Sequence, residues 1–190
     1  VPVAVSAFTG EQLEQQGVKT PVDLARTVPS LATGQSQNSS SSVTFVLRGQ
    51  SASDIIMTID QAIGLYADGG YIPRPYGLNA AMVDLQSVEV LKGPQGTLYG
   101  RNTTGGAINF ISRSPDYAGL HGYATGEVGN YQNFKFTGAV NVPLIDDVLT
   151  TRLAYQHWRR EGSGNSRITG QDLGSDKGQD YVRGSLRWTP

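Results

Sequence analysis

Two segments near the middle of the chain alternate hydrophobic and polar residues with the period of two that a β-strand requires. They are residues 87–91 and 107–113, and the connector between them is rich in glycine. In the first segment Val88 and Val90 share one face, against Glu89 on the other. In the second segment Ile108, Phe110 and Ser112 alternate with Ala107, Asn109 and Ile111. Glycine permits positive φ and close backbone approach, so the pattern predicts two strands joined by a tightly folded connector.

Helical signals occur before these strands. Ser6 or Thr9 can cap a short helix over 10–16, which Gly17 would end. Thr20 precedes Pro21, a favoured first helical residue, and an apolar stripe then stops before Pro29. The members of that stripe are Val22, Leu24, Ala25 and Val28. Both helices are expected to cover one face of a sheet.

The segment 34–42 is polar and rich in serine, which predicts an exposed loop before a strand at 43–47. Another strand is expected near 63–67. Together with the two strands above and the preceding helices, this order predicts a compact α+β domain that ends near residue 115.

After Gly119 the pattern changes to long alternating segments without helical periodicity. A tight turn is predicted at Asp146-Asp147, and a longer loop at 161–180. The apolar face comprises Phe134, Phe136, Val140, Val142, Leu149, Leu153, Val182, Leu186 and Trp188. Strands of about ten residues with one apolar face fit a transmembrane β-barrel. A soluble antiparallel sandwich gives the same alternation, so this half alone leaves both interpretations open.

Composition narrows the function classes. Residues up to Pro115 carry seven basic and eight acidic side chains, and the remainder carries eight of each. This balance excludes the basic excess of a nucleic-acid-binding protein. The absence of cysteine excludes disulfides and thiolate chemistry. The chain starts without Met or a signal peptide, so we expect such a peptide to be cleaved or to lie outside this sequence, and no apolar run predicts a transmembrane helix.

No set of residues predicts catalysis or metal binding. His121 and His157 fall on separate strands without spaced Asp or Glu partners. Ser40–Ser42 lack the Gly-x-Ser-x-Gly elbow of a serine hydrolase, and the glycines of 93–106 have the wrong spacing for a phosphate-binding loop. We therefore expect no enzyme, no cofactor and no resident metal.

Three motifs in register resemble the plug domain of TonB-dependent outer-membrane receptors. Residues 88–94 (VEVLKGP), 98–100 (LYG) and 105–109 (GGAIN) match the last segment of that plug, while 45–49 (FVLRG) and 65–69 (LYADG) match its earlier strands. The resemblance covers about the first 115 residues motif by motif, and the remainder by its strand pattern. It implies an α+β plug with a small mixed sheet and short helices (1–115), followed by the first antiparallel strands of a transmembrane β-barrel (116–190).

The resemblance also implies a function. Such receptors import a scarce nutrient, most often a ferric siderophore, across the outer membrane, with energy supplied by the periplasmic partner TonB. Cobalamin, oligosaccharides and haem are alternative cargoes. The runner-up is a non-transporting soluble periplasmic or surface binding module with a β-sandwich. The family's TonB-binding peptide precedes the plug, and residues 1–8 look like sequence just after it, so no coupling residue is assigned.

Two groups of site residues follow. Arg48 and Lys92 end apolar strands, so we expect both side chains to be partly buried and to need a partner. One possibility is an ion pair inside the plug with Glu89 or Asp68. The resemblance implies the other, a contact with charged groups of the barrel wall. The full motif set, assigned to plug structure or to plug–barrel contacts, is Arg48, Gly49, Asp68, Gly69, Glu89, Lys92, Gly93, Pro94, Leu98, Tyr99, Gly100, Gly105, Gly106 and Asn109.

The second group is a candidate ligand-binding rim, formed by Gln50, Tyr71, Arg74 and Tyr76, with 50–54 as a neighbouring part. Two prolines make the 71–76 loop an unlikely core segment, whereas its tyrosines and arginine suit an anionic or hydroxyl-rich ligand. A stiff loop that only packs against the barrel interior is the alternative.

Overall fold

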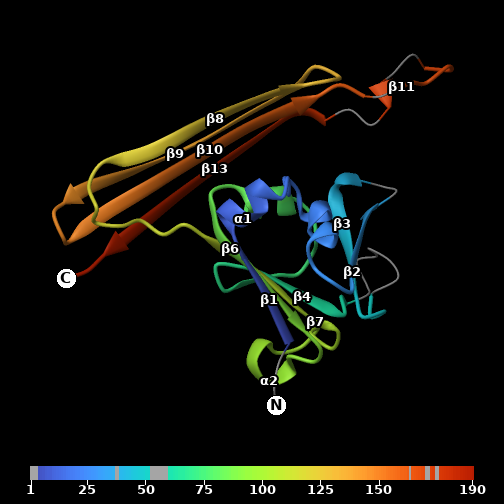
Figure 1. Ribbon diagram of the computed structural model, residues 1–190, viewed down its shortest axis with the longest axis horizontal. Helices are drawn as coiled ribbons and strands as arrows, with labels where there is room; N and C mark the ends of the chain where they lie inside the picture. The colour runs from blue at the N-terminus through green and yellow to red at the C-terminus, as the bar shows by residue number, and fades with distance from the viewer. Residues whose placement is uncertain (1–3, 37–38, 52–59, 163, 170–171, 174–175) are drawn as a thin grey trace. The chain divides into compact units, whose positions relative to one another are not determined.

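The computed structural model describes residues 4–36, 39–51, 60–162, 164–169, 172–173 and 176–190. The chain forms two compact units, Val1–Ser112 and Arg113–Pro190. Each unit is considered by itself below (Figure 1).

The first unit is built on a mixed five-stranded sheet with the order β1-β6-β7-β4-β5 (Figure 1). The strands are β1 (Ala4–Thr9), β4 (Ile63–Ala67), β5 (Gly70–Ile72), β6 (Leu85–Lys92) and β7 (Gly106–Ser112). Strands β4 and β7 run parallel, whereas the other neighbours are antiparallel. The predicted α+β fold with a small mixed sheet is therefore confirmed, although β1 and β5 were not predicted.

One face of this sheet carries the hydrophobic core. Val88 pairs with Phe110 and Val90 with Ile108 across β6 and β7, and all four side chains are buried. The same core includes Leu13 of α1 (Gly10–Gln15) and Leu24 of the 3₁₀-helix η1 (Pro21–Arg26). Val28, which follows η1, also belongs to it. The residues that the alternation places on one face of each strand are thus the buried ones.

Local capping explains where the two helices begin. The Thr9 side chain accepts a hydrogen bond from the Gln12 backbone N–H at 3.2 Å, and the Gln12 side chain accepts one from the Thr9 N–H at 3.0 Å. This reciprocal arrangement is a capping box, which satisfies two N–H groups that a helix start leaves without partners. Gly17 follows the helix with φ of 70°, as a residue that ends a helix commonly does. The second helix begins at Pro21 as predicted, but it is a 3₁₀-helix.

The predicted loop over 34–42 is wrong for its described residues, 34–36 and 39–42. Strands β2 (Leu31–Ser36) and β3 (Ser39–Leu47) pair antiparallel, with Gln35 opposite Val43. Backbone hydrogen bonds do not depend on side-chain polarity, so the ladder extends into the serine-rich segment, and Ser42 is fully buried. A further 3₁₀-helix, η2 (Leu78–Met82), packs on the same core through Leu78.

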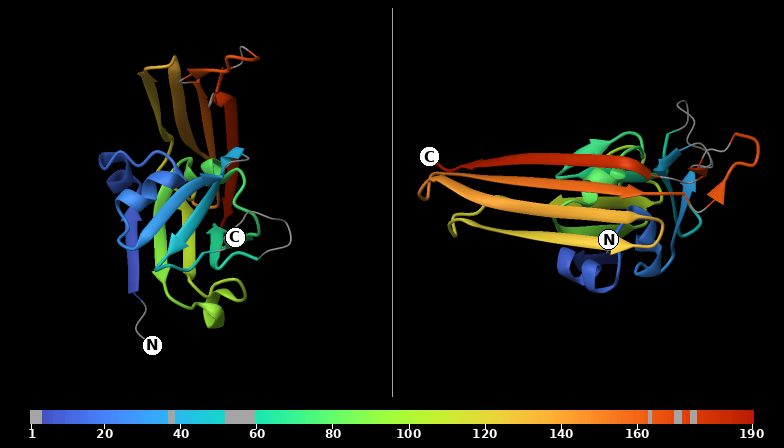
Figure 2. Two further views of the ribbon diagram at one scale, coloured as in Figure 1. Left: turned by 90° about the vertical axis from the view of Figure 1, so that its right-hand side faces the viewer. Right: turned by 90° about the horizontal axis from the view of Figure 1, so that it is seen from above.

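The second unit is a four-stranded antiparallel sheet with the order β13-β10-β9-β8 (Figures 1 and 2). Its strands are β8 (His121–Gly129), β9 (Asn133–Ile145), β10 (Leu149–Arg160) and β13 (Asp176–Trp188). The turn at Asp146-Asp147 is where the sequence predicts it. The predicted loop over 161–180 is partly wrong, because it contains the short strands β11 (Gly164–Asn165) and β12 (Asp172–Leu173) and the start of β13.

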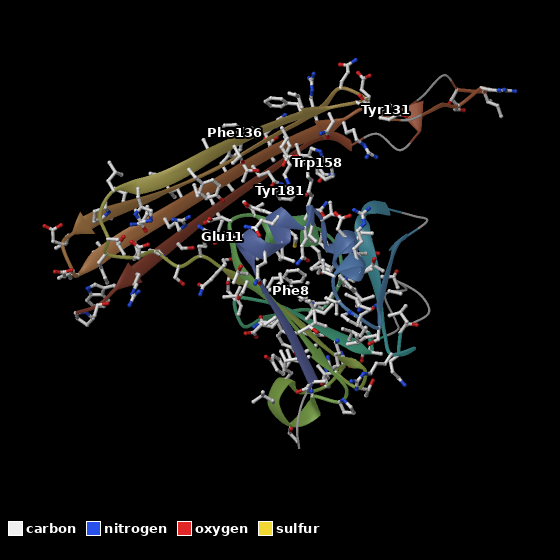
Figure 3. The ribbon with its side chains drawn as sticks, viewed as in Figure 1. Phe8, Glu11, Tyr131, Phe136, Trp158 and Tyr181 are labelled. Carbon is white, nitrogen blue, oxygen red and sulfur yellow. The ribbon has the colours of Figure 1, made fainter. Side chains whose placement is uncertain are left out.

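The two faces of this sheet differ in polarity. One face exposes large hydrophobic side chains to solvent: Val128, Phe134, Phe136, Val140, Leu153, Tyr155, Val182, Leu186 and Trp188. Val142 and Leu149 share that face but are only partly exposed. Figure 3 shows Phe136 on the opposite side of the sheet from Trp158 and Tyr181. We refer to the face of Phe136 as the outer face.

The other face of the sheet carries polar groups that bond to one another. The Asn141 side chain accepts a hydrogen bond from the Asp116 N–H and donates to the Asp116 and Gly119 carbonyls. Thr137 donates to the Gln156 side chain at 3.2 Å. A sheet with polar contacts on one side and exposed hydrophobic residues on the other has the polarity of a membrane barrel wall. Among the described residues, no helix is long and apolar enough to cross a membrane.

Candidate functional site

The Asp68-Gly69 pair of the first unit forms a two-residue turn between β4 and β5. Asp68 and Gly69 have φ of 49° and 80°, the conformation for which Asp-Gly is favoured in tight hairpins. The Asp68 carboxylate accepts a hydrogen bond from the Ser112 backbone N–H at 2.7 Å, and the Asp68 N–H donates to the Phe110 carbonyl at 2.9 Å. This motif therefore fastens the hairpin to the end of β7.

Arg48-Gly49 makes a second turn of the same kind. Their φ angles are 52° and 78°, and Leu47 and Gln50 exchange backbone hydrogen bonds of 3.0 and 2.9 Å across the turn. The expected partial burial is wrong for Arg48, which is exposed because the turn projects it from the sheet end, whereas Lys92 is half-buried. Within the described ranges, no ion pair joins either cation to Glu89 or Asp68.

The Arg48 guanidinium lies near the backbone of the α-carbon that follows Lys92. A Cβ placed on Gly93 would lie 3.7 Å from Nη1 of Arg48, so the guanidinium lies beside the residue that follows Lys92.

The glycine-rich connector is a closed loop. The Gly93 N–H donates to the Gly105 carbonyl at 3.0 Å, and the Gln95 N–H donates to the Thr103 carbonyl at 2.9 Å. A one-turn helix, α2 (Gly96–Tyr99), lies inside it. Gly93 and Gly100 have φ of 99° and 81°, so both positions require glycine's freedom. Pro94 and Leu98 are exposed on this loop, and Leu98 reaches 76% exposure. We call residues 93–105 the α2 loop.

A tyrosine cluster holds the α2 loop against the second face of the sheet. The Tyr66 hydroxyl donates to the Tyr99 carbonyl at 2.6 Å, and the ring centroids of these residues lie 4.9 Å apart. Tyr71 contacts Tyr66 at 5.5 Å, and its hydroxyl accepts a hydrogen bond from Asn102 at 3.0 Å. Burial raises the pKa of both Tyr66 and Tyr99, with smaller contributions from neighbouring tyrosines for Tyr66 and from Glu89 for Tyr99. The phenols therefore remain neutral donors at physiological pH.

The Gly105-Gly106 pair allows two segments to approach the sheet closely. A Cβ on Gly105 would lie 2.7 Å from the Gln50 Cβ. Gly106 has φ of 150°, and a Cβ there would lie 2.6 Å from Cδ2 of Leu47 and still closer to the Leu91 carbonyl oxygen. Any larger residue at Gly106 would push β6 or the Arg48-Gly49 turn away.

The predicted rim residues have different neighbours. Gln50 lies beside Gly105, Tyr71 lies on the edge strand in the tyrosine cluster, and Tyr76 forms an isolated backbone bridge with Ser42. Arg74 donates to the Pro73 carbonyl at 3.2 Å. The expectation that the 71–76 loop avoids the core is wrong in part: Pro75 is buried and Ile72 packs against the core. Residues 52–54 of the predicted rim lie outside the described residues.

Glu89 and Asn109 are cross-strand neighbours on the second sheet face. Both are half-buried, and the buried side-chain oxygen of Asn109 has no hydrogen-bond partner in the described part of the chain. Sequence reasoning missed Asn102 and Thr103. Thr103 is buried, and its methyl would lie 2.5 Å from a Cβ on Gly64. Both lie within three residues after the Leu-Tyr-Gly motif, but only the folded loop reveals their contacts.

Across the described ranges, no three His, Asp or Glu side chains converge as a metal site would require. What the arrangement provides is a sheet with an attached loop, tight turns and exposed cations.

Comparison with known proteins identifies relatives for the whole chain. The family model described as TonB-dependent Receptor Plug Domain matches residues 1–107. The pesticin receptor of Yersinia pestis is 32% identical over 171 residues, which cover 90% of this chain and 24% of that protein. The ferrioxamine receptor of Yersinia enterocolitica is 27% identical over 197 residues, covering 98% of this chain and 24% of that receptor.

A solved structure gives the same result. The ferric yersiniabactin uptake receptor FyuA of Yersinia pestis matches with a TM-score of 0.86 at 28% identity, covering 99% of this chain and 29% of that chain. The likeness therefore includes both units. The chain spans about a quarter of the length of the pesticin and ferrioxamine receptors.

Proposed function

Because the chain belongs to the family of TonB-dependent receptors that carry a plug domain, we propose that it forms the plug and first barrel strands of an outer-membrane importer. In this assignment residues 1–115 are the plug, and residues 116–190 begin the transmembrane barrel. The relatives are receptors and transporters, not enzymes.

The observation that carries the proposal is the polarity of the second unit. Its outer face exposes Leu153 at 51%, Val182 at 78% and Trp188 at 68%, while the other face carries bonded polar side chains. A soluble β-sandwich would bury such a row against a second sheet. Lipid is the environment in which this face is stable, which supports the barrel over the soluble binding module.

The proposed cargo is a ferric siderophore. This choice is supported by the relatives, whose names refer to ferrioxamine and ferric yersiniabactin. The rim residues Tyr71, Arg74 and Tyr76 would contribute a cation and phenols toward an anionic, oxygen-rich chelate. Gln50, which lies beside Gly105, would add an amide.

The plug would gate the barrel through its charged turns. Neither Arg48 nor Lys92 forms an ion pair with a carboxylate among the described residues, so we propose that acidic groups of the barrel wall lie opposite them. Glu89 would meet a wall group of opposite charge on the second sheet face. Such polar contacts exchange readily for water, which suits a plug that rearranges when TonB pulls on it from the periplasm.

The cargo proposal is tested by ligand binding to the purified complete receptor that contains this chain. Quenching of intrinsic fluorescence would be titrated with ferric yersiniabactin, ferrioxamine and cyanocobalamin. We expect saturable binding of one ferric siderophore and none of cyanocobalamin. Binding of cyanocobalamin alone would keep the receptor assignment and overturn the cargo.

The rim proposal is tested with a matched pair of variants in the same assay. Arg74→Gln should weaken siderophore binding by about tenfold, the size of one charge-assisted hydrogen bond. Arg101→Gln, which removes an exposed cation of the α2 loop, should leave binding unchanged. Equal affinities of the two variants would remove Arg74 from the site.

A further inference from the structure

A polar network lies on the otherwise hydrophobic outer face of the second unit. The Asp180 carboxylate accepts a hydrogen bond from the Tyr155 hydroxyl at 2.7 Å and contacts Nδ1 of His157 at 2.9 Å. Tyr155 and His157 belong to β10, and Asp180 lies directly opposite His157 on β13. The Tyr155 hydroxyl and the His157 ring therefore stabilise the Asp180 carboxylate on an apolar face. The bond to Nδ1 holds the imidazole in place and leaves its Nε2 outside this contact.

The network marks one end of the apolar band. Between Asp180 and Trp188 the outer-face residues of β13 are Val182, Gly184 and Leu186. Eight residues of strand span roughly 27 Å, which at a tilt of about 40° corresponds to roughly 20 Å of membrane depth. This is close to the apolar band of about 25 Å in outer-membrane barrels. The network thus lies at one membrane surface and Trp188 at the other.

The end that carries the network is opposite the tight turn at Asp146-Asp147 and adjoins the longer 161–175 connection. In bacterial barrels the short turns face the periplasm and the long loops face outward. If the second unit is a barrel wall, the network lies at the level of the outer leaflet.

An exposed cation lies beside the network. Arg159 is opposite Phe134 on β9 and follows His157 by two residues, so it shares the outer face at a spacing of about 7 Å. Within the part of the chain that the structure describes, Arg159 makes no ion pair. The Phe134 ring contacts the His157 ring with centroids 6.2 Å apart. We call Phe134, Tyr155, His157, Arg159 and Asp180 the outer-end patch.

A bulge lies on the β13 side of the patch. The register between β10 and β13 shifts between Trp158 and Arg160, and Gly178 has φ of 68° there. A Cβ on Gly178 would lie 4.0 Å from Cε1 of His157. Because glycine has no side chain, Gly178 itself does not fill the space next to His157 at the bulge.

We propose that the outer-end patch binds a phosphate group of the phosphorylated glycolipid that forms the outer leaflet. The inference rests on the proposed barrel function. The Arg159 guanidinium supplies the fork of donors that suits phosphate, and Nε2 of His157 supplies another donor when the ring is protonated. Asp180 holds that ring by its other nitrogen. Phe134 offers an apolar surface to the sugar and acyl chains just below the phosphate.

The test uses the complete receptor in detergent, with native mass spectrometry to count bound diphosphoryl lipid A. The wild type should retain lipid A, and Arg159→Gln and His157→Gln should each weaken its binding by about tenfold or more, the effect of a lost charge-assisted bond. Arg160→Gln is the matched control. It removes the same charge one residue further along, on the other face, and should leave binding unchanged.

Three results would overturn the inference. The first is undiminished lipid A binding by Arg159→Gln, and the second is an equal loss in Arg160→Gln. The third is equal retention of fully dephosphorylated lipid A or of phosphatidylglycerol, which would show that the phosphorylated glycolipid is not recognised.

The assay separates this inference from the proposed function. Variants that insert into the outer membrane and import iron but bind lipid A like the wild type would refute the patch alone. Failure of the wild type to insert would refute both.

Discussion

Removing one hydroxyl from the tyrosine cluster tests how the α2 loop is held. Tyr66→Phe keeps the ring contacts with Tyr99 and Tyr71 and deletes only the 2.6 Å bond from the Tyr66 hydroxyl to the Tyr99 carbonyl. A net hydrogen bond contributes about 1 kcal/mol, and a carbonyl left without a partner raises the loss to about 2 kcal/mol. Local opening of the loop should therefore become about 5 to 30 times more frequent.

Hydrogen–deuterium exchange of peptides covering 93–105 in the complete receptor measures this opening. Amides bonded inside the loop, such as the Tyr99 N–H to the Gln95 carbonyl, should lose protection by that factor. Tyr76→Phe is the control, because Tyr76 is exposed and lies outside the cluster. Unchanged protection in Tyr66→Phe, or an equal loss in Tyr76→Phe, would refute the reasoning.

The pKa of Tyr66 adds a pH test to the same experiment. Burial raises this pKa above its ordinary value of about 10. Below about pH 10 the Tyr66 hydroxyl therefore keeps the proton that makes the bond, both in the closed loop and in the opened loop. The contribution is lost only as pH rises through the raised folded pKa. The ratio of protection between wild type and Tyr66→Phe should thus be the same at about pH 6 and about pH 9. A ratio that falls toward one by about pH 9 would contradict the assignment of Tyr66 as donor.

Two further predictions concern the glycine pair and the outer face. Gly106→Ala should destabilise the plug by more than about 1 kcal/mol, because the new Cβ would meet Leu47 and the Leu91 carbonyl. The sensitivity of the plug to protease should therefore rise. Gly96→Ala is the control and should be neutral, because nothing lies within 4 Å of a Cβ at that position. Val182→Arg should reduce assembly of the barrel, measured by its heat-modifiable migration on a gel, since a cation at the membrane midplane costs about 2–4 kcal/mol. Ser185→Arg, on the polar face of the same strand, should assemble normally. Equal behaviour within either pair would contradict the corresponding assignment.

The sequence predicted the parts of the fold that depend on alternation. Val88 and Val90 face a core because the hydrophobic effect selects the face of a strand, and this selection leaves a period of two in the sequence. The same rule identified the outer face of β9 and β10. It did not identify β2 and the start of β3, because a ladder of backbone bonds leaves no trace in a serine-rich composition.

Site residues were harder to predict than strands. Arg48 follows an apolar strand, yet the two-residue turn projects it outward, and turn geometry of this kind depends on both strands that it joins. The network of Tyr155, His157 and Asp180 joins residues 23 to 25 positions apart. Such contacts depend on strand register, which a single sequence determines only after the pairing is known.

Energised uptake is the measurement that tests the central claim most directly. Cells lacking their own outer-membrane siderophore receptors would express the complete receptor and receive a radiolabelled ferric siderophore, with and without an uncoupler of the proton gradient. We predict iron accumulation that requires both the receptor and the gradient, and none after deletion of residues 93–106 in a protein that still inserts. Accumulation that persists with the uncoupler, or normal uptake by the deletion variant, would contradict a TonB-driven importer gated by this plug.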